Sequence, residues 1–161
     1  MIAIIDYDAG NTFNVQKALQ HIGLDAVLTA DRDTILAADG VILPGVGAYA
    51  SAVSVLRERG LIDVIHEVVE RNIPLLGICL GMQLLFDESE EYGPTPGLGI
   101  IPGTVKAIPN NLGLRVPHMG WNQNTLCRKD SVFSDVSDKY TYFVHSYYVD
   151  TDSQYIATTA D

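Results

Sequence analysis

The sequence predicts a doubly wound α/β fold, in which helices cover both faces of a mostly parallel sheet. Two observations indicate it. Short apolar runs alternate with helix-period segments along the first 80 residues, which is typical of β-α-β units. Glycine-containing loops follow several of these runs, at the carboxyl ends of strands where such sheets place their ligands. From Glu88 onward the pattern changes to short β-like runs, which predict antiparallel hairpins added to the sheet.

The strands expected in the first half are short apolar runs, as parallel strands buried on both faces should be. They are residues 2–5, 26–28, 41–43 and 73–78. Helices are expected between them at 14–22, 31–38, 48–58 and 61–71. The first of these helices has apolar residues at the spacing of one helix face, and Gly23 is suited to end it. Asp31 is suited to cap the second, and Gly60 separates the last two.

Beyond the fourth strand, residues 82–86 can continue as a helix. An acidic run at 87–91 and a proline- and glycine-rich loop at 93–97 follow. Strands are then expected at 104–108, 114–116, 140–144 and 154–158. Neither a linker composition nor an internal repeat interrupts the chain, so we expect residues 1–161 to form a single domain.

Composition restricts the class of function. The chain has 20 acidic and 10 basic residues, a net charge of −10, which argues against nucleic acid or an anionic membrane as a general partner. It contains neither an apolar stretch of membrane-spanning length nor a basic-then-apolar leader, and its two cysteines form no disulfide framework. These features predict a cytoplasmic protein. The spacing of His, Cys, Asp and Glu indicates no metal site, and no cofactor is expected.

The segment Gly-Ile-Cys-Leu-Gly at 77–81 carries the clearest indication of chemistry. It places Cys79 at the end of a predicted strand and before a predicted helix, with glycines that relieve crowding in a tight strand-to-helix turn. Amides at the start of the helix favour a thiolate and can stabilise a developing oxyanion. Cys79 is therefore predicted to be a nucleophile. The alternative is an ordinary buried cysteine, which the flanking glycines make harder to explain.

Several segments together carry a family resemblance. They are Pro-Gly-Val-Gly at 44–47, Gly-Ile-Cys-Leu-Gly at 77–81, Pro-His-Met-Gly-Trp-Asn at 117–122 and Phe-Val-His-Ser-Tyr at 143–147. In these segments, and nearly from end to end, the chain resembles the class I (triad) glutamine amidotransferases. Within that family it is similar to the glutaminase subunits that serve histidine biosynthesis. The resemblance implies a flavodoxin-like fold and a separate (β/α)₈ cyclase subunit as the partner in a heterodimer, to which ammonia is channelled.

The resemblance also implies roles for individual residues. Cys79 would attack the side-chain carbonyl of glutamine and form a thioester. The oxyanion would be held by the Leu80 amide and by the region of Val46 and Gly47. The amino-acid end of glutamine would be held by Gly45, Gln83, Ser146 and Tyr147. Asn11, Trp121, Asn122 and Tyr142 would face the cyclase, although Trp121 read from the sequence alone could equally be a core residue.

Two features depart from the family pattern. Asp8 stands where the family usually has glycine, and the family's His-Pro-Glu segment, which supplies the base and the acid that orients it, does not occur in these 161 residues. His118 and His145, as isolated strand histidines, are expected to be structural rather than catalytic. We therefore expect this chain to lack its C-terminal end and, without the triad His and Glu, to be inactive as a glutaminase. The alternatives are an inactive amidotransferase-like module that only binds a partner, and a cysteine hydrolase or stress protein of the related flavodoxin-like elbow fold. That group places a histidine close after the cysteine, where this chain has Leu80.

Overall fold

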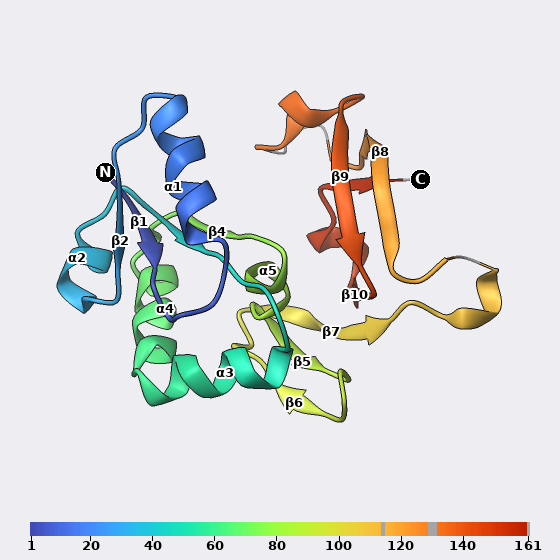
Figure 1. Cartoon of the computed structure of the whole chain (residues 1–161), viewed down its shortest axis with the longest axis horizontal. Helices are drawn as coiled ribbons and strands as arrows, with labels where there is room; N and C mark the ends of the chain where they lie inside the picture. Colours follow the sequence, from blue (N-terminus) through green and yellow to red (C-terminus); the bar gives the residue numbers. More distant parts are fainter. Residues whose placement is uncertain (114, 129–131, 161) are drawn as a thin grey trace.

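A parallel four-stranded sheet forms the centre of the first half of the molecule (Figure 1). The computed structural model describes residues 1–113, 115–128 and 132–160. The strands have the order β2-β1-β3-β4 and confirm the predicted ones: β1 Ile2–Ile5, β2 Ala26–Thr29, β3 Gly40–Leu43 and β4 Leu75–Gly77. The last strand starts later than expected because the Ile73 amide donates to the Val68 carbonyl and so still belongs to the end of the preceding helix.

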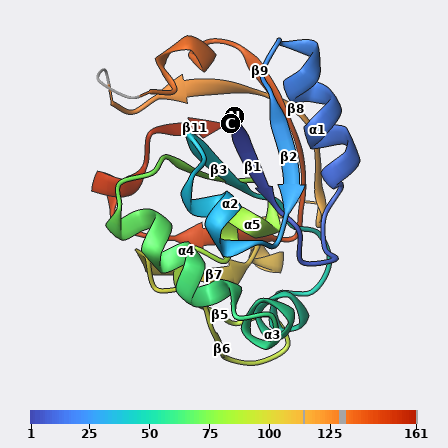
Figure 2. The same ribbon diagram turned by 90° about the vertical axis from the view of Figure 1, so that its left-hand side faces the viewer.

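Helices cover both faces of this sheet, as predicted. They are α1 Thr12–His21, α2 Arg32–Leu36, α3 Tyr49–Glu58 and α4 Leu61–Glu70. Helices α2 and α4 pack together on one face, while α1 lies on the other (Figures 1 and 2). Asp31 caps α2 by accepting a 2.9 Å hydrogen bond from the Thr34 amide. In the described part of the chain, no helix has the length and apolar character needed to cross a membrane.

The hydrophobic core lies mainly between the sheet and the face that carries α3 and α4. Tyr49 and Leu56 of α3 and Ile65 of α4 are fully buried there with Leu43 of β3. Helix α1 contributes no buried residue. Its side of the sheet is therefore much less densely covered than the side of α3 and α4.

The second half forms two further sheets instead of extending the first. One is mixed and has the order β10-β7-β5-β6, and the other is antiparallel with the order β11-β8-β9. Their strands are β5 Phe86–Ser89, β6 Thr95–Pro96, β7 Ile101–Ala107, β8 His118–Leu126, β9 Tyr140–His145, β10 Tyr147–Asp150 and β11 Thr158–Ala160. Short 3₁₀ helices occur at η1 Asn110–Leu112, η2 Ser134–Val136 and η3 Ser153–Tyr155.

Several predicted boundaries in this half are wrong. The helix expected at 82–86 is instead α5 Leu80–Gln83, and Phe86 already begins β5. The cause is tertiary: the Leu85 carbonyl accepts the amides of Ile100 and Ile101, which starts a strand where local periodicity favours a helix. The loop expected at 93–97 contains β6. In the strand expected at 154–158, the first two residues belong to η3 and only Thr158 belongs to a strand, β11.

The strand expected at 114–116 is not found where the chain is described. Its first residue, Leu114, lies outside the described residues, and Val116 forms a cis peptide with Pro117 just before β8 begins at His118.

One residue, Ser146, separates β9 from β10. The chain thus leaves the antiparallel sheet and enters the mixed sheet within a single step. The Ser146 carbonyl accepts the Ile108 amide at 2.9 Å, which fixes the crossing point. This junction faces the carboxyl ends of β3 and β4, and the candidate site lies between them.

Candidate active site

Cys79 occupies a strained strand-to-helix turn. It follows β4 and immediately precedes α5, with φ 55° and ψ −119°. A non-glycine residue in such a conformation costs about 1–3 kcal/mol, and this strain is typical of functional sites. The thiol is free and the residue is exposed, so the buried-core reading of Cys79 is wrong. The backbone geometry is that of a nucleophile elbow.

The two glycines of the elbow are required by close backbone contacts. A Cβ on Gly77 would lie 2.5 Å from the Cα of Met82, and a Cβ on Gly81 would lie 1.9 Å from the carbonyl oxygen of Leu43. The same oxygen accepts the Ile78 amide at 3.0 Å. The end of β3 and the start of α5 are therefore in direct backbone contact, and this contact holds Cys79 at the sheet edge.

Backbone donors lie beside the thiol. Leu80 is the first residue of α5, so its amide has no acceptor within the helix. Val46 and Gly47 lie in the loop after β3, where Val46 is 54% exposed and Gly47 has φ 93°. These residues and Cys79 line one cavity of about 450 Å³. Because α5 has only four residues, its dipole contributes little, and the individual amides must supply the stabilisation of negative charge.

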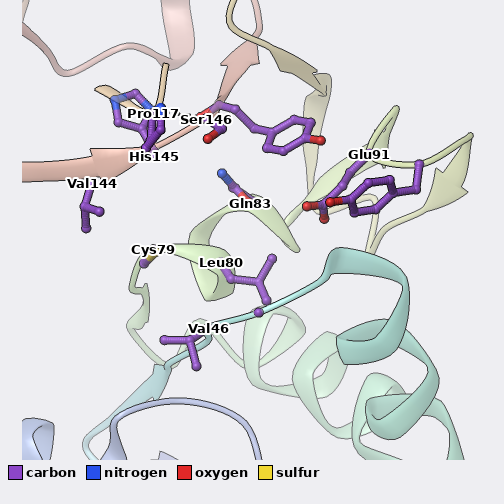
Figure 3. A pocket seen from close by; sticks show the side chains of 12 residues that line it. Val46, Cys79, Leu80, Gln83, Glu91, Pro117, Val144, His145 and Ser146 are labelled. Atoms are coloured by element: carbon purple, nitrogen blue, oxygen red, sulfur yellow. Dashed lines mark hydrogen bonds between the residues drawn. The ribbon is translucent and has the colours of Figure 1, made fainter. Parts of the chain in front are cut away.

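The opposite wall is formed by Gln83 and by the β9–β10 junction. Gln83 lies on α5 one turn after Cys79, and Ser146 and Tyr147 line the same cavity (Figure 3). Gly45, the remaining residue predicted to bind substrate, is buried and does not appear among the lining residues. A Cβ there would lie 2.7 Å from the Gly81 amide nitrogen. Gly45 thus sits behind the cavity, between the loop and α5.

Glu91 is a cavity residue that the sequence did not predict. Its carboxylate accepts a 2.7 Å hydrogen bond from the Tyr49 amide, at the start of α3, and the half-buried residue lines the cavity. In Figure 3 its side chain lies across the cavity from Cys79, beyond Gln83. It belongs to the acidic run at 87–91, and composition alone does not distinguish it from its solvated neighbours. Tyr92, Pro117, Val144 and His145 also line the cavity.

His145 reaches the cavity but has no spare ring nitrogen. Its Nδ1 lies 2.9 Å from the Tyr147 carbonyl oxygen, so Nδ1 carries a proton and donates it there. Its Nε2 lies 2.8 Å from His118 Nδ1, so the two ring nitrogens share one hydrogen bond. The His118 Nε2 in turn lies 3.0 Å from the Asn122 side chain. Taking the Cys79 proton would require His145 to break one of these bonds, which supports a structural role for both histidines.

The predicted partner residues are accessible. Trp121 is 68% exposed and Tyr142 52%, so the core reading of Trp121 is wrong. Their rings pack edge to face across β8 and β9 with centroids 5.5 Å apart. Asn122 is half-buried on β8, and Asn11 is exposed just before α1.

Asp8 lies in the loop that also carries Asn11. Its φ is 61°, a conformation in which glycine is relaxed, and its carboxylate forms an exposed ion pair with Arg59. Such pairs contribute at most about 1 kcal/mol.

Two buried tyrosines should make the protein sensitive to alkali. Burial raises the pKa of Tyr7 and of Tyr49 to about 12, from an ordinary value of 10. Nearby negative charge adds to the effect, from Cys79 for Tyr7 and from Glu88 and Asp87 for Tyr49. Since the folded state favours the neutral phenol, this contribution to stability is complete below pH 10 and is lost as pH rises through 12.

We therefore expect a Tyr7→Phe/Tyr49→Phe double variant to lose less unfolding free energy than the unmodified chain between about pH 9 and about pH 11. Urea unfolding at each pH measures it. Equal losses in both proteins would contradict the assignment.

Among the residues that the structure describes, no group of three or more His, Cys, Asp and Glu side chains is placed to hold an ion.

The sequence matches the family described as "Glutamine amidotransferase class-I" over residues 3–161. The chain belongs to this family. Solved structures agree on the fold. A protein titled "Crystal structure of glutamine amidotransferase" aligns with a TM-score of 0.69 at 20% identity, covering 89% of this chain and 71% of that one. The "Structure of PurLQS from Thermotoga maritima" aligns with a TM-score of 0.67 at 19% identity, covering 99% and 73%.

The curated relatives define the subfamily. "Imidazole glycerol phosphate synthase subunit HisH" from Lacticaseibacillus casei is 54% identical over 161 residues, all of this chain and 77% of that protein. The protein of the same name from Streptococcus sanguinis is 50% identical, covering all of this chain and 78% of its own length. Within the class-I amidotransferases, the chain is thus a member of the HisH subfamily.

Proposed function

We propose that the chain is a glutaminase, which hydrolyses glutamine to glutamate and ammonia through a thioester on Cys79. One observation carries the proposal: the strained Cys79 elbow opens into the same cavity as Val46, Gly47 and Leu80. A nucleophile beside several backbone amides is the arrangement that acyl transfer requires.

The reaction divides into two acyl transfers. The Cys79 thiolate forms an S–C bond to the side-chain carbonyl carbon, and the electron pair of the C=O bond moves to oxygen, where amides near Leu80 and Val46 stabilise it. Collapse of this intermediate breaks the C–N bond, and ammonia leaves with an added proton. Water then attacks the thioester, releasing glutamate and regenerating the thiol.

Recognition of the substrate's amino-acid end falls to the opposite wall. Glu91 places a negative charge in the cavity, which suits the α-ammonium group of an amino acid. Gln83, Ser146 and Tyr147 add neutral donors and acceptors around it. Gly45 does not line the cavity, but its lack of a side chain lets the loop after β3 lie close to α5.

None of the histidines in this chain is well placed to take the proton of the Cys79 thiol. Of its four histidines, His21 and His66 lie on α1 and α4, outside the cavity, and His118 and His145 are tied into a hydrogen-bonded chain. General acid–base catalysis typically contributes about 10²–10⁴-fold. We therefore propose that these 161 residues alone turn over glutamine slowly.

The names of the relatives support the wider role. We assign the chain as the glutaminase subunit of imidazole glycerol phosphate synthase, which passes ammonia to a (β/α)₈ cyclase subunit in histidine biosynthesis. The cyclase would form imidazole glycerol phosphate and an aminoimidazole carboxamide ribotide. Trp121 and Tyr142, with Asn11 and Asn122, form the proposed interface. Val144 lies on the same exposed face of β9 as Tyr142 and also lines the cavity, so this surface reaches the cavity mouth. Both cysteines are free, as is typical of proteins in a reducing compartment, and this supports a cytoplasmic location.

Ammonia release from glutamine, measured with the cyclase subunit and a nucleotide ligand present, tests the proposal. We expect slow release that added imidazole accelerates, because imidazole can replace a missing base. Cys79→Ala should lower release by about 10³-fold or more under both conditions.

The outcomes separate the alternatives. If glutamine fails to protect Cys79 from alkylation, the chain is not a glutaminase, and an inactive partner-binding module becomes the better description. Fast Cys79-dependent release without imidazole would indicate that His118 or His145 serves as the base, and His145→Asn and His118→Asn would then identify which.

A further inference from the structure

The hydroxyl of Tyr7 lies where three parts of the site meet. Tyr7 follows β1, is fully buried, and donates a 2.7 Å hydrogen bond to the carbonyl oxygen of Pro44. Pro44 is the first residue after β3 and leads into the loop with Val46 and Gly47. The loop that carries Tyr7 packs on the same segment, since a Cβ on Gly10 would lie 3.2 Å from Pro44 Cβ.

Gly45 links this hydrogen bond to the nucleophile elbow. A Cβ on Gly45 would lie 2.7 Å from the Tyr7 hydroxyl and 2.7 Å from the Gly81 amide nitrogen. The hydroxyl therefore lies near α5 as well as near the loop. The Cys79 charge also acts on Tyr7, as the second cause of its raised pKa after burial.

The loop is held at both of its ends and open between them. Tyr7 donates to the Pro44 carbonyl at the start of the loop, and Glu91 accepts the Tyr49 amide at its end. Between these anchors Val46 is 54% exposed, and a Cβ on Gly47 would meet no atom within 4 Å. The direction of the Pro44 carbonyl sets the plane of the peptide entering Gly45. Through it, the hydrogen bond anchors the start of the segment that carries the amides of Val46 and Gly47.

We propose that Tyr7 is a positioning residue for the oxyanion hole, because its hydroxyl fixes the Pro44 peptide from which the oxyanion loop extends. This inference rests on the proposed glutaminase function. It predicts that losing the hydroxyl harms stabilisation of the oxyanion more than it harms binding of glutamine, which keeps a planar amide.

The chain offers a matched control. Tyr49 is also a fully buried tyrosine, but its hydroxyl is the buried side-chain polar atom that has no hydrogen-bond partner among the described residues. Tyr7→Phe and Tyr49→Phe each remove one buried oxygen. Only the first removes a hydrogen bond to the loop.

Two ligands separate the effects. The γ-aldehyde of glutamate forms a reversible hemithioacetal with Cys79, in which the S–C bond forms and the former carbonyl oxygen gains the negative charge or the thiol proton. Its affinity reports the oxyanion hole. Glutamine, assayed by protection of Cys79 from iodoacetamide, reports ground-state binding. Both measurements use the full chain with the cyclase present.

For Tyr7→Phe we expect the aldehyde affinity to fall by about 10–100-fold and the glutamine affinity to change by less than about 2-fold. Tyr49→Phe should change neither. An unchanged aldehyde affinity, or equal losses for both ligands, would overturn the proposal. If Tyr7→Phe does not fold, 3-fluorotyrosine at position 7 keeps the shape and strengthens the donor. An unchanged ratio of the two affinities would then overturn it. If the unmodified chain forms no adduct, the glutaminase assignment fails and this inference fails with it.

Discussion

Gly81→Ala should destabilise the folded protein by about 3 kcal/mol and remove the selective reactivity of Cys79. The added Cβ would lie 1.9 Å from the Leu43 carbonyl oxygen and 2.7 Å from its carbon. Both atoms belong to the backbone of β3, so no side-chain rotation relieves the contact. Helix α5 must move away from the strand, and the Cys79 turn, which is held by that contact, must relax with it.

Gly40→Ala is the matched control. Gly40 is a buried glycine on β3, the strand that Gly81 contacts. The nearest atom to its added Cβ is the terminal Cδ1 of Ile2, at 3.3 Å. We expect a change within about 1 kcal/mol. Urea unfolding measures stability, and iodoacetamide labelling in a Cys127→Ser background measures Cys79 alone. A Gly81→Ala protein with unaltered stability and labelling rate would contradict the packing described for the elbow.

Glu91→Gln should weaken glutamine binding by about 10–100-fold, which corresponds to a charge-assisted hydrogen bond. The substitution keeps an oxygen that can accept the Tyr49 amide, so α3 retains its contact while the cavity loses its negative charge. We therefore expect little change in unfolding free energy. Protection of Cys79 by glutamine measures the affinity, and glutaric acid monoamide, which lacks the α-ammonium group, should bind both proteins equally.

Glu90→Gln provides the comparison, because Glu90 is exposed and lies outside the cavity lining. It removes the same charge from the adjacent position and should leave glutamine affinity unchanged. A similar loss in both variants would mean that net charge, not a specific contact at Glu91, governs binding.

The sequence predicted the first half of the fold well because its information is local. Buried parallel strands such as 41–43 are continuous apolar runs. Asp31 marks the start of a helix through its capping side chain, and Gly60 separates two helices through its left-handed backbone. The second half depends on pairing between distant segments. Phe86 looks helical by periodicity, but its neighbour Leu85 accepts amides from Ile100 and Ile101. A local pattern does not contain that information.

The same distinction applies to the site. The motif at 77–81 predicted the Cys79 elbow, because glycine spacing and backbone crowding are both local properties. Glu91 was missed because its role depends on a contact with the start of α3, 42 residues away in sequence. Tyr7 was missed for the same reason, since its partner Pro44 follows β3, 37 residues away in sequence.

Because β9 leads directly into the junction at Ser146, the residues that line the cavity depend on the register between β8 and β9. Side chains alternate along β9, so a slip of one residue against β8 would turn Val144 away from the cavity and carry the following segment with it. His118 and His145 sit opposite each other in that register, and the 2.8 Å hydrogen bond between their rings forms in this alignment. The hydrogen bond between the two histidines thus links correct pairing of β8 with β9 to the position of the β9–β10 junction, which forms one wall of the cavity.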